Sequence, residues 1–442
     1  MDKGTIMQIV AEQNVRFIRL QFTDILGVMK SISITADQLE KALNGELMFD
    51  GSSIEGFVRI EESDMYLKPD LDTFLVLPWT IPNSPSKTAR LICDIYDSDN
   101  KPFEGSPRYA LKKVLNEAAE MGYTMKVGPE PEFFMFQLDE HGAPTLRTND
   151  KAGYFDLPPV DKGENARRDM VETLQSIGFE IEASHHEVAP GQHEIDFKYQ
   201  DALKTADNIV TFRIVVRTVA QKHGLHATFM PKPLYGLAGS GMHLHISLFK
   251  GEENAFYDAD DPTGLSDSGR FFIAGVMRHV RAITAITNPT VNSYKRLVPG
   301  YEAPVYIAWS YRNRSPLIRI PARRGIGTRI EVRSPDPTCN PYLGLAVILK
   351  AGLEGIKNRE QPLPPVDKNI YEMNLADRKL NNIESLPENL YEAVAELNRD
   401  EVIQQALGNH IHSRFCYAKI KEWETYSSRV YDWEIEEYLE KF

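Results

Sequence analysis

Residues 127–136 read VGPEPEFFMF, and this run places Glu130 and Glu132 among apolar and aromatic residues. Its length and composition predict a β-strand. Side chains two positions apart on a strand point to the same face, so the two carboxylates are expected to lie side by side. Neighbouring carboxylates repel each other unless a cation lies between them. The run therefore predicts a cation-binding strand, and the flanking apolar residues and prolines disfavour the alternative, a solvated strand face.

The residues before this strand predict a small N-terminal unit of short strands. Three runs have the apolar and polar alternation of half-buried strands or resemble it: residues 15–22, 74–77 and 91–95. A turn-rich stretch at residues 98–105 marks a boundary. A helix is expected directly after it, with Ser106 as its cap, Pro107 in its first turn and Gly122 at its end.

The residues after this strand predict a larger unit in which strands and helices alternate. Helices are expected near residues 164–177, 201–223, 267–287 and 340–357. The last ninety residues are mostly helical and charged in pattern. A chain of 442 residues is long for one simple core, so two domains are expected.

The composition excludes several classes of protein. The net charge of −13 argues against a nucleic-acid-binding protein, which usually presents a basic face. Three widely separated cysteines, Cys93, Cys339 and Cys416, fit neither a disulfide framework nor a zinc knuckle. The N-terminus has no signal-peptide pattern and the most apolar helical run is too short to span a bilayer, so a cytoplasmic protein is expected.

Residues 184–194 (SHHEVAPGQHE) add potential metal ligands at a turn. Glu187 and Glu194 stand at the two ends of this turn, which contains Pro190 and Gly191. The histidines of the motif would also suit zinc, but no HExxH pattern is present. This motif alone does not distinguish a glutamate-based metal site from a zinc site.

Residues 239–249 (GSGMHLHISLF) predict a strand that carries His243, His245 and Ser247 on one face. Single histidines are more often structural than metal ligands, but a pair after a Gly-Ser-Gly bend favours a site. Residues 329–333 (RIEVR) place Glu331 between two arginines, an arrangement that an ordinary ion pair also explains.

Together these motifs give an oxygen-rich ligand set: Glu130, Glu132, Glu187, Glu194, Glu331 and His243. Such a set suits Mg²⁺ or Mn²⁺ better than zinc or copper. Six ligands exceed what one magnesium ion usually takes from a protein, so a two-metal site is plausible.

An arginine-rich segment complements this set. Residues 312–333 contain seven arginines and no lysine. Guanidinium groups make bidentate contacts to phosphate and carboxylate. Embedded prolines and apolar residues, and the lack of an aromatic stacking pattern, weaken the alternative of an RNA-binding patch. Arginines beside metal-binding glutamates favour phosphoryl transfer to or from a nucleotide, without the GxxxxGK[ST] motif of a P-loop enzyme.

Seven motifs occur in order along the chain: FDGSSIEGF, GPEPEFF, HHEVAPGQHE, GSGMH, NSYKRLVPGYEAP, RNRS and RIEVRSPDP. With them the chain resembles, essentially end to end, a bacterial type I glutamine synthetase of the short subtype that is not adenylylated. The resemblance implies that ATP phosphorylates the γ-carboxylate of L-glutamate and that ammonia then displaces the phosphate, giving L-glutamine, ADP and phosphate in nitrogen assimilation.

The resemblance also implies roles for individual residues. The matches divide the metal ligands into two sets, one of Glu132, Glu187 and Glu194 and the other of Glu130, His243 and Glu331. Matches to glutamate-binding positions are Gly239, Arg296, Glu302 and Arg333. Matches to the ATP site are Glu182, Tyr199, His245, Ser247, Arg314, Arg319 and Arg329. Matches to the ammonium pocket are Asp50, Ser53, Tyr154 and Glu187.

Three of these matches imply catalytic roles. Asp50 would take a proton from ammonium, and Arg314 would bind the transferring phosphoryl group. Glu302 would belong to a mobile flap that shields the intermediate from water.

An α+β fold is implied, with a β-grasp domain at residues 1–102 and a catalytic domain of curved antiparallel β-sheet and helices at residues 103–442. The implied assembly is a homododecamer of two stacked hexamers with active sites between subunits. Asp50 would then come from one chain and the metal glutamates from its neighbour. The C-terminal residues 433–442 would reach into the opposite ring.

Two positions depart from the pattern of many relatives. Ala238 stands where they have asparagine before GSGMH, which puts one contact to the glutamate amino group in doubt. Tyr371 lies in NIYEMNLADR, which keeps a tyrosine but lacks the prolines and acids of an adenylylation loop, so no adenylylation is expected. Feedback inhibition by glutamine, with Arg59 and Glu302 as contributors, and contact with a nitrogen-responsive transcription regulator are further expectations.

Two other functions compete with this one. A γ-glutamyl ligase that uses a polyamine would share ATP, metals and glutamate, but the presence of both Asp50 and Glu302 favours ammonium. A catalytically inactive regulatory relative would be expected to lack a metal ligand, and none is missing from the motifs.

Overall fold

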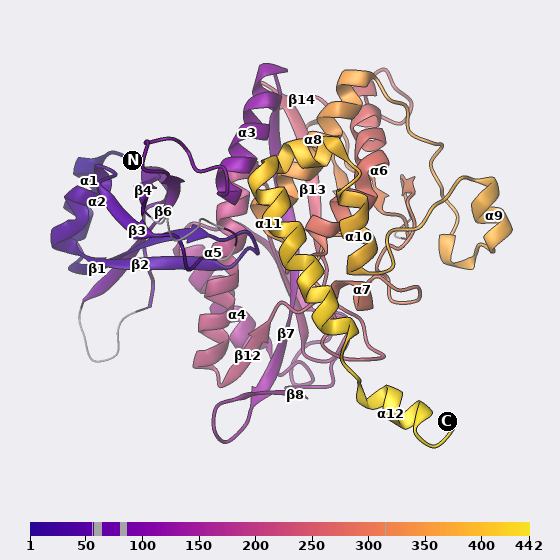
Figure 1. Ribbon diagram of the computed structural model, residues 1–442, viewed down its shortest axis with the longest axis horizontal. Coiled ribbons are helices and arrows are strands. Elements are labelled where there is room, and N and C mark those ends of the chain that lie inside the picture. The colour runs from indigo at the N-terminus through magenta and orange to yellow at the C-terminus, as the bar shows by residue number, and fades with distance from the viewer. Residues whose placement is uncertain (55, 57–63, 80–85, 314) are drawn as a thin grey trace.

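The computed structural model describes residues 1–54, 56, 64–79, 86–313 and 315–442. The first unit is a six-stranded sheet with two helices beside it, and it forms one side of the molecule (Figure 1). Its strands are β1 (Val15–Thr23), β2 (Met29–Thr35), β3 (Leu47–Asp50), β4 (Asp64–Pro69), β5 (Leu75–Val76) and β6 (Lys87–Tyr96). Its helices are α1 (Lys3–Glu12) and α2 (Leu39–Leu43).

The strand order of this sheet is β2-β1-β6-β4-β3, and β1 and β6 run parallel. The strand predicted at residues 15–22 matches β1, in which the buried Ile18 and Leu20 alternate with the exposed Phe17 and the half-buried Arg19. The alternation does not extend over the whole strand, because Gln21 and Phe22 are both buried. The two helices were not expected from the sequence. Asp2 caps α1 by accepting a hydrogen bond from the Thr5 amide at 2.8 Å, a signal that the sequence does contain.

The second unit is built on an eleven-stranded sheet with the order β15-β16-β17-β13-β7-β10-β9. Its strands are β7 (Thr124–Leu138), β8 (Pro144–Thr148), β9 (Ile181–His186), β10 (Gln192–Phe197), β11 (Gln200–Asp201), β12 (Leu225–Thr228), β13 (Met242–Lys250), β14 (Glu253–Asn254), β15 (Trp309–Ser310), β16 (Ile318–Arg319) and β17 (Ile330–Val332). All pairings in this sheet are antiparallel except that of β15 with β16. The predicted α+β fold is confirmed, with this one parallel pair as a refinement.

Helices, several of which cover the sheet, make up the rest of the second unit. They are α3 (Pro107–Glu120), α4 (Glu164–Ser176), α5 (Ala202–Lys222), α6 (Asp267–Thr287), α7 (Ser293–Arg296), α8 (Pro341–Asn358), α9 (Leu375–Leu380), α10 (Leu390–Leu397), α11 (Glu401–Ser427) and α12 (Asp432–Tyr438). The helices predicted after Ser106 and near 164–177, 201–223, 267–287 and 340–357 match α3, α4, α5, α6 and α8. Ser106 does precede α3, but its side chain makes no capping hydrogen bond.

The buried helix α8 lies at the centre of the helical layer and packs against α3, α5, α6 and α11. Glycines permit its closest approach to α6, since a Cβ atom at Gly275 would lie 2.1 Å from the carbonyl oxygen of Ala351. By contrast, α9 and α12 project from the body of the molecule (Figure 1). Among the described residues, no helix is both long and apolar enough to cross a membrane.

A buried ionic junction joins the two units. Arg108 on α3 contacts Asp70 at 2.6 Å and Asp94 at 2.8 Å, both in the first unit. The same guanidinium contacts Asp207 on α5 at 3.0 Å, and the hydroxyl of Tyr342 on α8 also donates to Asp207. Since the Arg108 side chain is only 5% exposed, these contacts fix how the first unit sits on the second.

Candidate active site

The register of four neighbouring strands brings the predicted acidic residues together. Glu130 on β7 lies opposite His243 on β13, and Glu132 on β7 lies opposite Glu194 on β10. Glu331 on β17 lies opposite His245 on β13 in the same way. The predicted period-two spacing of Glu130 and Glu132 therefore puts both carboxylates on one face of the sheet.

One group of ligand atoms lies around the turn between β9 and β10. The Glu187 amide donates to the Gln192 carbonyl at 2.7 Å, which closes the turn. His185 Nε2 lies 3.0 Å from Glu194 Oε1, and His185 Nδ1 lies 3.6 Å from Glu187 Oε1. From the sequence His185 was considered only for the zinc alternative, but its ring nitrogens face the carboxylates of Glu187 and Glu194. Glu132 lies next to this group, because the charges of Glu187 and Glu194 both act on its pKa.

Repulsion dominates this first group. Burial, with the charges of Glu187 and Glu194, raises the pKa of Glu132 well above its usual value. Burial, with Glu130 and Glu187, likewise raises the pKa of Glu194. The pKa of Asp196 is raised to about 9 by burial and by Glu194. Carboxylates that disfavour one another's ionisation are well suited to a divalent cation, because its charge would remove the repulsion.

A second group surrounds Glu130. Its Oε1 lies 2.6 Å from His245 Nε2, and its Oε2 lies 3.3 Å from His243 Nδ1. His243 Nδ1 is also 3.7 Å from Glu331 Oε1. Burial alone would raise the pKa of Glu130, but hydrogen bonds from His243 and His245 lower it, and the lowering prevails. Burial and Arg333 lower the pKa of His243 to about 4, so its imidazole is neutral and can act as a metal ligand.

The donor set in both groups fits hard divalent cations. Ligand atoms of Glu130, His245 and Glu331 all lie within 4.8 Å of one another, as do those of His185, Glu187 and Glu194. Carboxylate oxygens predominate, which favours Mg²⁺ or Mn²⁺ over zinc or copper. The geometry thus brings all six predicted ligands into one region and adds His185 and His245 to it.

Arginines surround the second group. Arg333 Nη1 donates to Glu331 Oε1 at 2.6 Å, and Arg319 Nε also donates to Glu331. Arg329 Nε donates to His245 Nδ1 at 3.0 Å, which leaves the proton of this neutral ring on Nε2, facing Glu130. The expected ion pair at Glu331 is therefore present beside a possible metal site. Arg314, expected at the phosphoryl group, lies outside the described residues.

A cavity of about 290 Å³ opens beside Glu130. Five residues expected at the ATP site line it: Glu182, Tyr199, His245, Ser247 and Arg329. Arg319 does not line it and instead pairs with Glu331. Lys126 and Arg323 also line this cavity and add positive charge that the sequence argument did not assign.

A smaller cavity of about 40 Å³ is lined by the residues expected to bind glutamate. Gly239, Arg296, Glu302 and Arg333 line it, together with Glu132, Glu187, Ala238, Gly241 and His243. A Cβ atom at Gly241 would lie 2.6 Å from Arg296 Nη2 and 3.1 Å from His243 Nε2, so glycine keeps this approach open. Within the described part of the chain, the buried Nε of Arg333 has no hydrogen-bond partner.

The residues expected near ammonium are divided between the two units. Tyr154 stacks on Phe155 at 3.9 Å, and both rings lie edge-on to His185. Asp50 ends β3 in the first unit and Ser53 follows shortly after it. Of the described residues that line the two cavities, none comes from the first unit. The predicted regulatory residue Arg59 lies outside the described residues.

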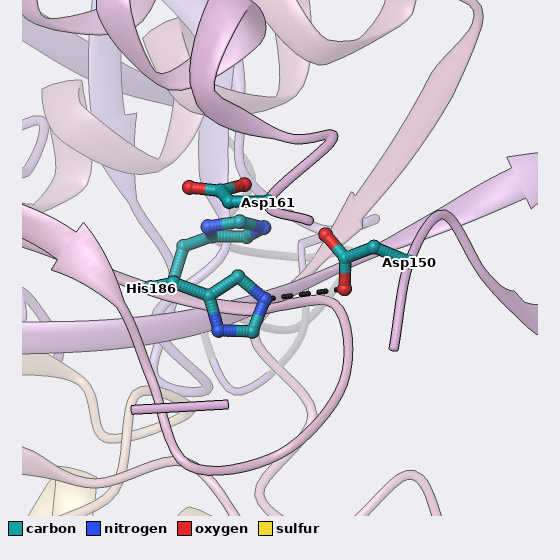
Figure 2. Close-up of side chains that lie close together, drawn as sticks. Asp150, Asp161 and His186 are labelled. Atoms are coloured by element: carbon teal, nitrogen blue, oxygen red, sulfur yellow. Dashed lines mark hydrogen bonds and ion pairs between the residues drawn. The ribbon is translucent and has the colours of Figure 1, made fainter. Parts of the chain in front are cut away.

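Buried polar side chains, among them Asp150, Asp161 and His186, lie close together in a cluster beside the turn between β9 and β10 (Figure 2). His186 Nε2 lies 3.2 Å from Asp150 Oδ1, and His186 Nδ1 lies 2.7 Å from the Glu187 carbonyl oxygen. Asp150 Oδ1 also accepts the Gly191 amide at 2.9 Å. Because both ring nitrogens face acceptors, His186 is expected to carry both protons. The pair fixes the backbone at both ends of the turn that presents Glu187.

Asp161 and His193, the other two side chains of this cluster, contact the positively charged Arg167. Arg167 Nη1 donates to Asp161 Oδ2 at 2.8 Å and contacts His193 Nδ1 at 2.9 Å. The four side chains of the cluster have the spacing of metal ligands, but the Arg167 guanidinium already supplies a positive charge beside Asp161 and His193. Asp161 and His193 therefore form a structural network.

Replacing Asp150 by asparagine is expected to destabilise the fold by about 3 kcal/mol, because it leaves the His186 imidazolium buried without its counter-charge. Urea unfolding monitored by circular dichroism measures this loss. Asp169→Asn is the matched control, since Asp169 also contacts a histidine, His223, at 2.7 Å but on the surface. Equal stability of the two variants would contradict a supporting role for Asp150.

The acidic groups, the arginines beside them and the adjoining cavity are typical of a class of enzymes, those that transfer a phosphoryl group with the help of divalent metals. Comparison with known proteins narrows this class. The family model "Glutamine synthetase, catalytic domain" matches residues 104–438, and "Glutamine synthetase, beta-Grasp domain" matches residues 14–98. The chain therefore belongs to the glutamine synthetase family.

Full-length relatives and solved structures agree with this assignment. A glutamine synthetase of Staphylococcus aureus (strain MW2) is 59% identical over 441 residues, which cover 100% of this chain and 98% of the relative. One of Clostridium saccharobutylicum is 59% identical over 440 residues, with coverages of 100% and 99%.

Two solved structures are also similar. A GmaS complex with ADP has a TM-score of 0.89 and 33% identity, over 98% of this chain and 99% of that one. The cryo-EM structure of Plasmodium falciparum glutamine synthetase has a TM-score of 0.87 and 26% identity, with coverages of 99% and 99%. The enzyme thus ligates ammonia to L-glutamate at the expense of ATP, through γ-glutamyl phosphate, and its substrates are glutamate, ATP and ammonium.

Proposed function

We propose that two divalent cations, Mg²⁺ or Mn²⁺, bind between the cavities, one at Glu132, Glu187 and Glu194 and the other at Glu130, His243 and Glu331. The observation that carries this proposal is the smaller cavity, where acidic ligands and arginines line the same space. The cations would neutralise charge on the transferring phosphoryl group. His185 and His245 would orient the carboxylates that they contact.

The substrate contacts follow from the charges of the two cavities. ATP would bind in the larger cavity, with Glu182, Tyr199, Ser247 and Arg329 around it. L-Glutamate would bind in the smaller one, with its carboxylates on Arg296 and Arg333. The buried and unpartnered Nε of Arg333 supports this assignment among the described residues. Gly239 would lie near the amino group, with Ala238 in place of an asparagine contact.

Ammonium would meet this site from a neighbouring copy of the chain, within a homododecamer of two stacked hexamers. Asp50 and Ser53 of the neighbour would complete a pocket with Tyr154 and Glu187, where negative charge attracts the cation. Asp50 would then accept the proton that frees ammonia for attack. The absence of first-unit residues from both described cavities supports this arrangement.

Several further proposals follow from the resemblance. The domain boundary would lie at residue 102, and the enzyme would act in the cytoplasm. Arg314 would contact the phosphoryl group, and Arg319, which pairs with Glu331, would contact the nucleotide. Glutamine would inhibit the enzyme with Arg59 and Glu302 involved. Binding of a nitrogen-responsive transcription regulator stays a prediction.

One assay tests the choice of amine. Purified enzyme with glutamate, ATP and Mg²⁺ is expected to release phosphate in step with glutamine when ammonium is added, and to release it only at a slow background rate without ammonium. Phosphate release is followed with a coupled colorimetric assay, and glutamine by chromatography. Equimolar putrescine replaces ammonium as the control amine. Phosphate release with putrescine but not with ammonium would contradict the proposal.

A further inference from the structure

The segment that carries Glu302 is held in an unusual backbone conformation. Glu302 has a φ of 59°, in the left-handed region that residues other than glycine seldom adopt. Such a conformation persists when the surrounding contacts impose it. The next residue, Ala303, is 4% exposed and lines the smaller cavity with Glu302. A contact at Ala303 can therefore control where the Glu302 side chain lies.

Tyr371 supplies such a contact. Its hydroxyl donates to the Ala303 carbonyl oxygen at 2.5 Å. Its ring lies 5.9 Å from the ring of Tyr306, centroid to centroid, on the same segment as Glu302. Arg378 in turn lies over the Tyr306 ring and donates to the Tyr306 hydroxyl at 2.7 Å. Tyr371 thus links the segment of residues 302–306 to the residues around α9.

The support beneath Tyr371 is fixed. Asn369 accepts the Tyr371 amide at 3.1 Å and so caps the short turn of residues 370–372. Ile370 is fully buried, and its amide donates to the Ser315 hydroxyl at 3.3 Å. The pKa of Tyr371 is raised to about 12, chiefly by burial, so the hydroxyl stays protonated and can donate near neutral pH. The hydroxyl can therefore donate to the Ala303 carbonyl oxygen throughout the neutral pH range.

We propose that Tyr371 is a positioning residue for the reaction: its hydroxyl holds the Ala303 carbonyl and thereby directs Glu302 over the bound γ-glutamyl phosphate. This inference rests on the proposed role of Glu302 as a flap residue. A correctly placed flap excludes water, so the intermediate reacts with ammonia in preference to being hydrolysed. The same hydrogen bond engages the tyrosine oxygen that adenylylation would modify, and the expectation that Tyr371 is not adenylylated stays a prediction.

The test measures how the intermediate divides between water and ammonia. Tyr371→Phe removes the hydroxyl and keeps the ring against Tyr306. Phosphate release without ammonium, divided by glutamine formation with saturating ammonium, is expected to rise about tenfold, the size expected for one lost hydrogen bond of about 1.4 kcal/mol. Tyr257→Phe is the control, since this ring is 38% exposed and lies outside both cavities.

Glu302→Ala separates the inference from the role on which it rests. This variant is expected to raise the same ratio further, because it removes the flap carboxylate itself. If Glu302→Ala raises the ratio and Tyr371→Phe leaves it at the wild-type value, the role of Tyr371 is overturned alone. If Glu302→Ala leaves the ratio unchanged, the flap role falls and the inference with it. A parallel fall of both rates in Tyr371→Phe, with the ratio constant, would indicate a merely structural residue and overturn the inference.

Discussion

Glutamine formation is expected to fall at least about a hundredfold when Glu132 is replaced by glutamine, because loss of a metal ligand exceeds the 10- to 100-fold effects of residues that merely support one. The substitution keeps the shape of the side chain and removes its charge. Glu132 Oε2 accepts the Gln192 side-chain amide at 2.8 Å and the Gly241 amide at 3.0 Å, and the carbonyl oxygen of glutamine can accept both, so the variant tests the charge.

Two measurements separate this effect from general damage. Isothermal titration with Mn²⁺ is expected to show one cation site fewer, or a much weaker one, in Glu132→Gln. Glu164→Gln serves as the control, because Glu164 forms only a surface ion pair with Arg168 at 3.0 Å on α4. A variant of Glu132 that binds Mn²⁺ as the wild type does and keeps its activity would remove Glu132 from the metal site.

Substitution of Asp50 by alanine is expected to slow glutamine formation by about 10² to 10⁴, the usual contribution of a general base. Hydrogen bonds from the Ser52 hydroxyl and amide lower the pKa of Asp50, so its carboxylate is ionised at neutral pH and can attract ammonium. Steady-state rates over a range of ammonium concentrations measure the loss. Near wild-type activity would remove the assigned role.

The position of Asp50 on a neighbouring chain has a sharper test. Asp50→Ala and Glu132→Gln subunits are each expected to be inactive, but hybrids assembled from both would contain some sites with an intact Asp50 and an intact Glu132. Partial activity should therefore return on mixing after dissociation and reassembly. Chains that carry both substitutions, mixed with Glu132→Gln chains, provide no intact pair and serve as the control. Hybrids without activity would contradict a site shared between subunits.

The sequence predicted which site residues share a face wherever those residues lie on a single strand. The alternation around Glu130 and Glu132 gave their common face, and the spacing of His243 and His245 gave theirs, because a strand repeats every two residues. The pairing of β7 with β10 and β13 could not be derived in this way. It depends on contacts between residues far apart in sequence, such as Glu132 opposite Glu194.

Other parts of the site carried too weak a signal. His186 and His193 stand beside metal ligands in the motif, yet they point into a buried network with Asp150 and Arg167. Spacing alone could not separate them from His185, which faces the carboxylates. The hydrogen bond of Tyr371 to a backbone carbonyl 68 residues away was equally invisible, because any residue can offer that carbonyl.

The buried ionic junction at Arg108 limits how the enzyme can move. A hinge between the two units would have to expose or separate a guanidinium that is shared by Asp70, Asp94 and Asp207, at a cost of several kcal/mol. The first unit is therefore expected to keep its position on the second unit, and Asp50 is expected to stay in place during the reaction. Gating of the reaction is left to short loops, whose rearrangement breaks few buried contacts, and the two units are expected to melt in a single cooperative transition.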